Sequence, residues 1–380
     1  MRMQSSSWQL LGEDSGGVPD GWQVAGQGWW ARSRVARGGI REGVPIVSLA
    51  VGDLEVDVLP TRGMGLHAAR AKGVRFGWDS PVAGPVHPAY VPLQEPSGLG
   101  WLDGFDEWLV RCGLESNGAP QFDASGKLQY PLHGRIANRP AREVELRLTE
   151  RGGLEIRGVV DETRFHFSKL RLISSLELLP DRPVLIVRDT IENLSESPAT
   201  AQLLYHINFG PPLLGEGART IVAAEEVVPR TPDAAAELDQ WDRMPAPEAG
   251  VPERVYFFRP RSDRDGWSRA ALVAADESLA ATISFQTSTL PCFSLWKNPT
   301  ALADGYVTGL EPATNYPNPR GFEEEQGRVV HLEPRGRVSF QVELGLWVGA
   351  DAVRAGVTPV EELAQPAPQL HAEAPPGWIA

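Results

Sequence analysis

The chain has 380 residues, 42% of them hydrophobic and 12 of them Trp, and its formal net charge is −13. This composition is typical of a folded globular protein, and no run approaches the roughly 18 unbroken apolar residues of a membrane span. The chain also lacks the clusters of Lys and Arg that bind nucleic acid, and its N-terminus lacks the apolar core of an export signal. We therefore expect a cytoplasmic protein whose ligand is a small molecule, with neither nucleic acid nor a membrane as a partner.

Apolar and polar residues alternate with a period of two along most of the chain, which predicts β-strands with one side facing a core. The runs with this pattern cover residues 46–60, 142–150, 164–180, 182–195, 218–229, 279–287 and 337–349. Most of the 39 Gly and 33 Pro fall between these runs, where turns require them. Helical periodicity is scarce, and short helices are expected only at 101–113, around 233–243 and around 359–365.

Many strands with few helices favour an antiparallel arrangement over a parallel sheet with crossover helices. We predict an all-β fold, a large antiparallel β-sandwich, as a single domain over residues 1–380, because no sharp change in composition divides the chain. The acidic stretch 230–252, rich in Ala and Pro, is expected to form a surface insertion, and 365–380 a loose tail. Residues 58–142 are rich in Gly, Pro, Trp and His, which is the character of binding loops on a rigid scaffold.

Three ionisable residues each follow a strand-like apolar run and precede loop-forming residues. His133 closes LQYPLHGRIANRP, His206 closes TAQLLYHINFG and Glu311 closes GYVTGLEPATNYP. An ionisable group at the end of a strand is costly unless it is paired or used in chemistry. Two imidazoles and a carboxylate that meet in one cleft would supply an acid, a base and a binding group, which are the groups that opening a sugar ring requires.

The two cysteines, Cys112 and Cys292, lie in apolar surroundings and form neither a CxxC pair nor a metal-ligand spacing. They are expected to be buried free thiols in a reducing compartment. The motifs GxSxG, HExxH and GxGxxG and the P-loop pattern are absent, which disfavours serine hydrolase, zinc protease, dinucleotide-binding and P-loop functions.

The segments around the three ionisable residues resemble the aldose 1-epimerases (galactose mutarotases), and most closely a bacterial branch whose activities are mostly unassigned. The resemblance rests on LHG around His133, on LLYHINFG and GLEPATNYP, and on the phrases RGMGL, GWLDGFDEWLVRCGL and PLHGRIANRPA. It spans about residues 45–347 and implies the galactose mutarotase-like supersandwich. It also implies interconversion of sugar anomers without a cofactor or a metal, with Glu311 as the base and His206 as the acid.

Two departures from that family bear on the substrate. His133 is followed by Gly134 and Arg135, where galactose mutarotases usually have LHGG. The arginine-containing phrase that the family carries upstream is missing in its usual form, and Arg62 in PTRGMG is the nearest equivalent. The fold and the acid/base pair are unaffected by these changes, whereas galactose or glucose as the substrate does not follow from the resemblance.

Sugar binding needs planar donors, hydroxyl acceptors and aromatic faces that stack on the C–H side of the ring. The residue types that fit are His133, which by resemblance holds the ring oxygen or a neighbouring hydroxyl, and Arg62, Asp103, Arg111, Asn117, Arg135, Lys297, Trp296 and Asn315. Trp101 is a second stacking candidate, and Asp106 a further acceptor. The sequence carries no signal for the identity of the sugar, for an acidic or phosphorylated group on it, or for an oligomeric state.

Three other functions use the same residues. The two His and one Glu could form a facial metal triad, although the chain has neither HxH nor HxxxH. Glu311 could pair with Asp103 or Asp106 as the two carboxylates of a glycosidase, or the cleft could host another carbohydrate reaction such as epimerisation or elimination. A sugar-binding protein without turnover would use the aromatic and arginine-rich loops alone.

Overall fold

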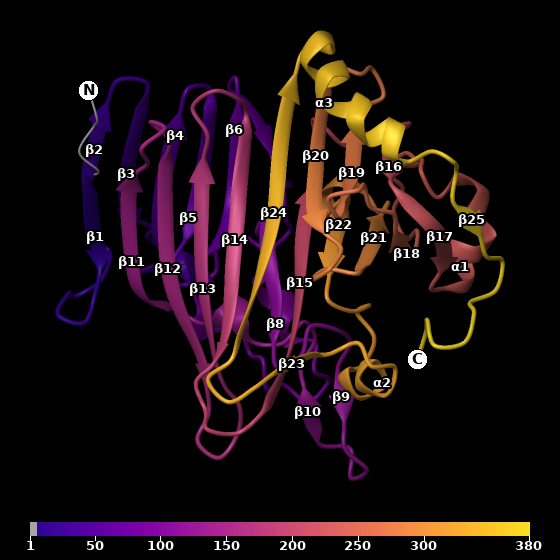
Figure 1. Cartoon of the computed structure of the whole chain (residues 1–380), viewed down its shortest axis with the longest axis horizontal. Coiled ribbons are helices and arrows are strands. Elements are labelled where there is room, and N and C mark those ends of the chain that lie inside the picture. The colour runs from indigo at the N-terminus through magenta and orange to yellow at the C-terminus, as the bar shows by residue number, and fades with distance from the viewer. Residues whose placement is uncertain (1–5) are drawn as a thin grey trace.

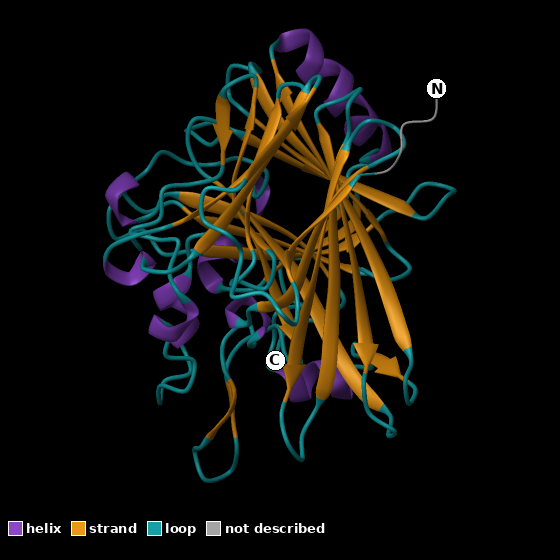
Figure 2. Ribbon diagram, turned by 90° about the vertical axis from the view of Figure 1, so that its left-hand side faces the viewer, coloured by secondary structure: helices purple, strands orange, loops and turns teal. Residues whose placement is uncertain are grey.

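The alternating runs form strands, and the strands assemble into two large sheets that face each other across the core (Figure 1, Figure 2). The computed structural model describes residues 6–380. The nine-stranded sheet contains, in spatial order, β1 (Ser7–Leu11), β11 (Ala141–Leu148), β12 (Leu154–Thr163), β13 (Lys169–Leu178), β14 (Val184–Asn193), β24 (Arg337–Val348), β20 (Leu279–Gln286), β19 (Trp267–Val273) and β16 (Arg219–Val222).

The second, fourteen-stranded sheet carries the residues of interest for function. In spatial order it contains β2 (Gln23–Gly26), β3 (Trp29–Val35), β4 (Pro45–Val51), β5 (Leu54–Leu59), β6 (Gly65–Ala71), β8 (Leu109–Leu114), β15 (Ala199–Phe209), β22 (Val307–Ala313), β21 (Cys292–Asn298), β18 (Arg254–Pro260), β17 (Ala224–Pro229) and β25 (Gln369–Leu370), with β7 (Val74–Phe76) on β6 and β23 (Val330–Leu332) on β15. Strands β9 (Gln121–Phe122) and β10 (Leu128–Tyr130) form a separate hairpin. Only the β17–β25 pair is parallel among the described strands, so the predicted all-β antiparallel sandwich is confirmed.

All seven predicted runs contain strands, but three of them differ from the expectation. Run 46–60 is a hairpin of two strands, β4 and β5, rather than one strand. Run 164–180 becomes a strand only at Lys169, because the preceding residues form the turn of the β12–β13 hairpin. Run 218–229 divides at Ala223 between the two sheets, so that β16 and β17 pair with different partners.

The helices are short apart from one. They are α1 (Pro232–Ala236), α2 (Arg320–Glu325) and α3 (Ala350–Leu363), and the 3-10 turns η1 (Gly39–Arg41), η2 (Pro88–Tyr90), η3 (Gly100–Gly104), η4 (Ile136–Asn138), η5 (Leu238–Gln240) and η6 (Leu302–Asp304). The helix expected at 101–113 is wrong, because only η3 forms there and LVRCGL continues as the central strand β8. The helix expected around 359–365 is longer and starts at Ala350. None of the helices within residues 6–380 combines the length and the hydrophobicity needed to cross a membrane.

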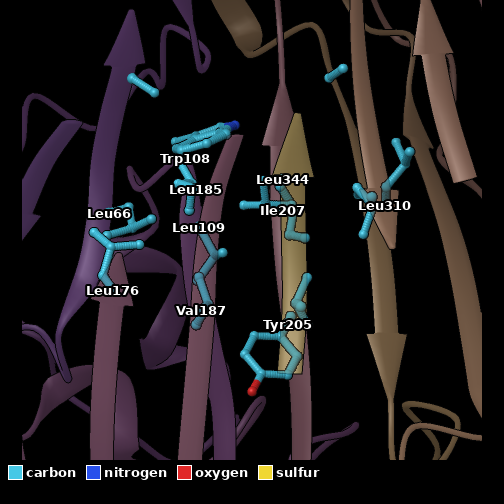
Figure 3. Close-up of a cluster of buried hydrophobic side chains, with 14 of the residues drawn as sticks. Leu66, Trp108, Leu109, Leu176, Leu185, Val187, Tyr205, Ile207, Leu310 and Leu344 are labelled. Atoms are coloured by element: carbon cyan, nitrogen blue, oxygen red, sulfur yellow. The ribbon is translucent and has the colours of Figure 1, made fainter. Parts of the chain in front are cut away.

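The main core lies between the two sheets. Figure 3 shows Leu66, Leu109, Ile207 and Leu310 of the larger sheet beside Leu176, Leu185, Val187 and Leu344 of the smaller one, all of them buried. A buried ion pair crosses this apolar layer, with Arg111 Nε 2.5 Å from an oxygen of Asp189. A buried ion pair that is fully hydrogen-bonded is tolerated in such a core, whereas either charge alone is strongly destabilising.

The opposite face of the larger sheet is also buried. Successive side chains of a strand point to opposite faces, so Tyr205 and Ile207 of β15 belong to the main core while Leu204 lies on the other side in a second apolar cluster. This second cluster contains Trp101 and Phe105 from the loop region before β8. The loops expected between 58 and 142 therefore cover one face of the sheet and enclose the residues that point out of it.

The stretches expected to be peripheral make internal contacts. Within 230–252, Ala234 and Met244 are buried in the main core. At the end of 365–380, Trp378 is buried, stacks on Tyr316 at 5.0 Å between ring centroids, and accepts a 2.9 Å hydrogen bond from Asn318 Nδ2 through its carbonyl. The expectation of a loose tail is therefore wrong at Trp378.

Candidate active site

A cavity of about 270 Å³ lies on the loop-covered face of the larger sheet. Its volume is just below the roughly 300–1,000 Å³ of pockets for drug-sized ligands, which suits a ligand of one sugar unit. The lining residues are Leu99, Trp101, Leu102, Phe105, Ala119, Leu132, His133, His206, Arg230, Glu253, Val255, Trp296, Glu311 and Pro317. Most of them are apolar or aromatic, and the ionisable ones are few.

His206 and Glu311 meet at the floor of the cavity. They lie on the adjacent strands β15 and β22, whose register pairs Ile207 with Leu310 and so brings the preceding and following side chains together on one face. His206 Nε2 is 3.2 Å from Glu311 Oε1. Both residues lie inside their strands, so the expectation that they close them is wrong, and the site occupies the middle of a sheet face rather than its edge.

The close approach of His206 and Glu311 depends on the absence of a side chain at Gly309. A Cβ atom built at this position would lie 2.7 Å from Glu311 Oε1 and 3.0 Å from His206 Cε1. Real Cβ contacts are longer than this, so any larger residue would have to move one of the two functional groups. A glycine at position 309 is therefore required for His206 and Glu311 to lie this close together.

The hydrogen bonds around Asn208 determine which ring nitrogen of His206 carries a proton. Asn208 Nδ2 donates to the backbone carbonyl of Glu107 at 3.0 Å, which leaves Asn208 Oδ1 as an acceptor 2.6 Å from His206 Nδ1. His206 Nδ1 must then be the protonated nitrogen. Its Nε2 carries a lone pair in the neutral ring and points at Glu311.

Burial shifts both groups of the pair toward their neutral forms. It raises the pKa of Glu311 to about 8, with a further contribution from the negative charge of Glu253. It lowers the pKa of His206 to about 3, and the neighbouring His133 lowers it further against an opposing hydrogen bond to Asn208. The contact between the two side chains lacks hydrogen-bond geometry, and Glu311 Oε1 has no hydrogen-bond partner among the described residues. At pH 7 the pair therefore holds one exchangeable proton, mainly on the carboxyl.

His133 is held by a tight turn next to the pair. Its backbone has φ 56°, and a Cβ on the following Gly134 (φ 73°) would lie 2.0 Å from the carbonyl oxygen of Ser116. The turn in LHG thus requires glycine after the histidine. His133 Nδ1 donates to the Asn117 carbonyl at 2.9 Å, so its Nε2 is a free acceptor, and burial lowers the pKa of His133 to about 4.

Aromatic rings form the walls around the histidines. Trp101 packs 4.6 Å from the His133 ring and 4.8 Å from Phe105, measured between ring centroids. Trp296 lies 5.4 Å from the His206 ring, and its Nε1 donates to Glu253 at 2.7 Å. These flat walls suit the C–H face of a pyranose.

Sequence reasoning missed Phe105, Arg230 and Glu253 as lining residues. Phe105 carried a usable signal, because it lies in the phrase GWLDGFDEWLVRCGL together with Trp101. Arg230 and Glu253 follow β17 and precede β18 at the two ends of the stretch expected to be an insertion. Only the pairing of these two strands brings them to the cavity, and no local pattern marks them.

Two of the arginines proposed for sugar binding lie away from the cavity. Arg62 is buried and donates to Glu107 Oε1 at 2.8 Å, to the Gly104 carbonyl and to Asn138 Oδ1. Arg111 points into the main core, where it pairs with Asp189. The physical reason is that each guanidinium already has its carboxylate partner in the protein, so neither is available to a sugar.

The amide and lysine candidates also have protein partners. The side-chain amides of Asn117 and Asn315 exchange two hydrogen bonds, of 2.9 and 2.8 Å. The contribution of Asn117 to the cavity is its backbone carbonyl, which accepts the hydrogen bond from His133 Nδ1. Lys297 lies on the core-facing side of β21 and donates to the carbonyls of Gln240 and Trp241, each at 3.3 Å. None of the three lines the cavity.

The remaining polar candidates, Asp103, Arg135 and Asp106, also lie outside the cavity. Asp103 is exposed on η3 and outside the cavity, and Arg135 lies 3.4 Å from Glu115 in a neighbouring groove. Asp106 is buried behind the wall, where it accepts from the Val86 amide at 2.9 Å, and burial raises its pKa to about 8. The structure thus brings together His133, His206, Glu311 and Trp296 of the proposed residues, with Trp101 as the second ring.

The alternative site types find less support in this arrangement. Neither Asp103 nor Asp106 lines the cavity, so neither can face Glu311 across a glycosidic bond there. Within residues 6–380, no three His, Cys, Asp or Glu side chains converge with the geometry of a metal site. The chemistry available at the cavity floor is therefore proton transfer between a carboxyl and an imidazole.

Comparison with known proteins places the chain in a family. Residues 41–346 match the model of the family described as a domain of unknown function, DUF4432. The chain is a member of the DUF4432 family. It is also similar to the crystal structure of a "putative aldose 1-epimerase" from Klebsiella pneumoniae, with 32% identity, a TM-score of 0.93, and coverage of 98% of this chain and 99% of that one.

More distant solved structures share the fold alone. A galactose mutarotase-like protein from Clostridium acetobutylicum has 15% identity and a TM-score of 0.59 over 85% of this chain and all of that chain. A galactose 1-epimerase from Lactobacillus acidophilus has 12% identity and a TM-score of 0.55 over 84% of this chain and 99% of that chain. The fold is therefore the galactose mutarotase-like sandwich predicted from the sequence. No curated protein matches the chain.

Proposed function

We propose that this protein is an aldose 1-epimerase-like isomerase that interconverts the anomers of a free sugar. The observation that carries the proposal is the contact of 3.2 Å between His206 Nε2 and Glu311 Oε1 at the floor of a cavity of about 270 Å³. A proton donor and a proton acceptor side by side in a water-poor site are what the reaction needs. The similarity to the Klebsiella protein described as a putative aldose 1-epimerase adds support.

The reaction can be written with the proton that the pair already holds. Transfer of this proton from Glu311 to His206 Nε2 produces a carboxylate and an imidazolium. The carboxylate removes the proton of the C1 hydroxyl while the imidazolium protonates the ring oxygen, and the bond between C1 and the ring oxygen breaks. The open sugar has an aldehyde at C1, Glu311 is protonated again and His206 is neutral. Rotation about C1–C2 and the reverse steps close the ring on the other face.

The other lining residues would bind and orient the sugar. With its Nδ1–H bound to Asn117, His133 offers Nε2 as an acceptor for a hydroxyl hydrogen. Trp101 and Trp296 offer aromatic faces on two sides of the histidines. This arrangement restricts the ring to one plane, so that C1 and the ring oxygen lie over the acid/base pair.

The proposal is tested by NMR exchange measurements on a panel of neutral and acidic free sugars. The wild-type protein should accelerate anomer exchange of at least one sugar without any change in its mass or its other stereocentres. Glu311→Gln should lower kcat by about 10²–10⁴-fold, because one positioned acid/base group contributes that much. Asp103→Asn is the matched control, since it also removes a carboxylate but lies on the exposed side of η3. A wild-type protein that leaves every sugar at its spontaneous exchange rate would contradict the proposal.

A further inference from the structure

A second hollow, of about 570 Å³, has a wall that packs against η3, because Gly100 and Gly104 lie against Pro92 and Val91. It is lined by the segment 88–94, which includes η2, and by residues that follow His133. Three arginines line it, Arg135, Arg139 and Arg164, and none of its lining residues is acidic. We call this hollow the arginine groove.

The charge of the arginine groove is opposite to that of the protein. The chain has 36 Lys and Arg against 49 Asp and Glu. Arg135 is partly neutralised by Glu115 at 3.4 Å and by the buried Glu162 nearby. The side chains of Arg139 and Arg164 have neither a hydrogen bond nor an ion pair within residues 6–380, and the Arg164 guanidinium lies over the ring of Phe167. Two guanidinium groups in the groove therefore remain without a carboxylate.

Asn138, which lines the groove, also carries a buried donor without an acceptor. Arg62 can only donate, so the Asn138 atom that it contacts is Oδ1, and Nδ2 points elsewhere. Asn138 is 8% exposed, and its Nδ2 has no hydrogen-bond partner. A buried N–H without a partner is unfavourable, and a ligand oxygen that reached it from the groove would satisfy it.

We propose that the arginine groove binds the oxyanion of a small metabolite, a phosphate or a carboxylate group. Guanidinium groups bind both in planar, bidentate fashion, and the amide of Asn138 adds a neutral donor of fixed position. The apolar residues of the groove, among them Val91 and Leu93, would contact the uncharged part of the ligand. This site is separate from the acid/base pair, and the proposal stands or fails independently of the proposed isomerase activity.

The groove is connected to the catalytic cavity through Arg62. This side chain binds Asn138 in the groove, the Gly104 carbonyl at the end of η3, and Glu107, whose carbonyl holds Asn208. Because η3 also carries Trp101, Arg62 joins Asn138 to the element that supplies one wall of the cavity. The connection gives the groove a physical route to influence sugar binding.

Calorimetric titration of the full chain at low ionic strength tests the proposal, with pyrophosphate and citrate as probes of the two oxyanion classes. We expect saturable binding of one equivalent of at least one probe, and weaker binding at about 0.15 M salt because exposed charges are then screened beyond about 8 Å. The double variant R139Q/R164Q should weaken that binding by about tenfold or more. Neither side chain is part of the hydrogen-bond network, so the variant should fold, and its thermal unfolding provides the check. The stronger of the two probes identifies phosphate or carboxylate as the preferred group.

Two control variants locate the bound anion. Arg264→Gln removes an arginine that does not line the groove and whose side chain is 93% exposed. This variant should bind the probe like the wild type. Arg230→Gln removes the arginine of the catalytic cavity and should do the same. The proposal is overturned if the wild type binds neither probe, if R139Q/R164Q binds as tightly as the wild type, or if Arg230→Gln alone abolishes binding.

Discussion

The two faces of the fourteen-stranded sheet differ in how completely their buried ionisable groups are hydrogen-bonded. On the face toward the smaller sheet, Arg111 is fully paired with Asp189, Ser174 and a backbone carbonyl. On the other face, Glu311 keeps an oxygen without a hydrogen-bond partner and has its pKa raised by burial. The first arrangement stabilises a fixed structure, whereas the second leaves a group ready to exchange a proton. The comparison teaches that burial alone does not distinguish a candidate catalytic residue from a structural one, because the two differ in whether their hydrogen bonds are already made.

The largest effect is expected from the core face, where Asp189→Asn removes the charge partner of Arg111. Breaking a buried ion pair costs about 3–5 kcal/mol, and urea-induced unfolding should register this loss. The double replacement of Arg111 by Met and Asp189 by Leu should recover most of it, because no buried charge remains. If Asp189→Asn unfolds at the wild-type urea concentration, the two faces do not differ in the proposed way.

Glu311→Gln on the cavity face should act on stability in the opposite direction. Because the folded-state pKa of Glu311 is raised from 4.5 to about 8, the folded protein loses stability as pH rises from 4.5 to 8, by about 1.4 kcal/mol for each pKa unit. The glutamine variant avoids this loss. It should match the wild type near pH 4.5 and be more stable at pH 9, as measured by chemical unfolding at both values. Equal stability at pH 9 would mean that Glu311 ionises freely in the folded protein.

The pair should also give the rate of the proposed isomerase reaction a pH limit on the alkaline side. The monoprotonated pair is lost as Glu311 loses its proton near pH 8, and on the acid side only as His206 gains one near pH 3. Because kcat/KM reports the ionisable groups of the free enzyme, a plot of kcat/KM against pH should be flat between these values and fall about tenfold per pH unit above 8. A rate that keeps rising through pH 9 would assign the reaction to a different base.

Gly309→Ala should reduce activity by about 10²-fold while leaving the core face intact. The added methyl group occupies the space between His206 and Glu311, and displacements of about 1 Å near the reacting atoms cost this much. Anomer exchange and urea unfolding measured on the same sample separate the two effects. Gly305→Ala is not a suitable control because its φ is 94°, whereas Gly215→Ala meets no atom within 4 Å and is the better one.

The smallest effect is expected at Asn208, a positioning residue. Asn208→Leu removes the acceptor that holds the Nδ1 proton of His206 and should lower kcat by about tenfold, with little change in KM. Asn208→Asp keeps an acceptor and adds a negative charge, so it should retain activity and move the acid limit of the pH profile upward. A leucine variant with an unchanged kcat would show that the tautomer is fixed by other contacts.

How much the sequence predicts depends on whether the deciding contacts are local. The strands, the antiparallel fold and the three ionisable residues follow from alternation and from short segments, and His133, His206, Glu311 and Trp296 do line one cavity. Strand parity would also have separated Trp296 from Lys297, because Lys297 shares the parity of the core residue Leu295.

The remaining errors come from contacts between distant parts of the chain. The amide pair of Asn117 and Asn315 joins positions 198 residues apart, and Arg62 finds Glu107 and Asn138 only once the loops have folded. No local pattern distinguishes a polar side chain with such a partner from one that is free to bind a ligand. The sequence therefore predicts the contact of His206 with Glu311 better than it predicts which polar residues line the cavity.

The stacking of Trp378 has a consequence for how the protein can be shortened. Trp378 packs on Tyr316, whose neighbour Asn315 binds the Asn117 side chain, and the Asn117 carbonyl in turn orients His133. Trimming the last residues, a common step in preparing crystals, would remove the outermost member of this series. Such a shortened protein can be expected to bind its substrate less well even though the deletion never reaches the pocket.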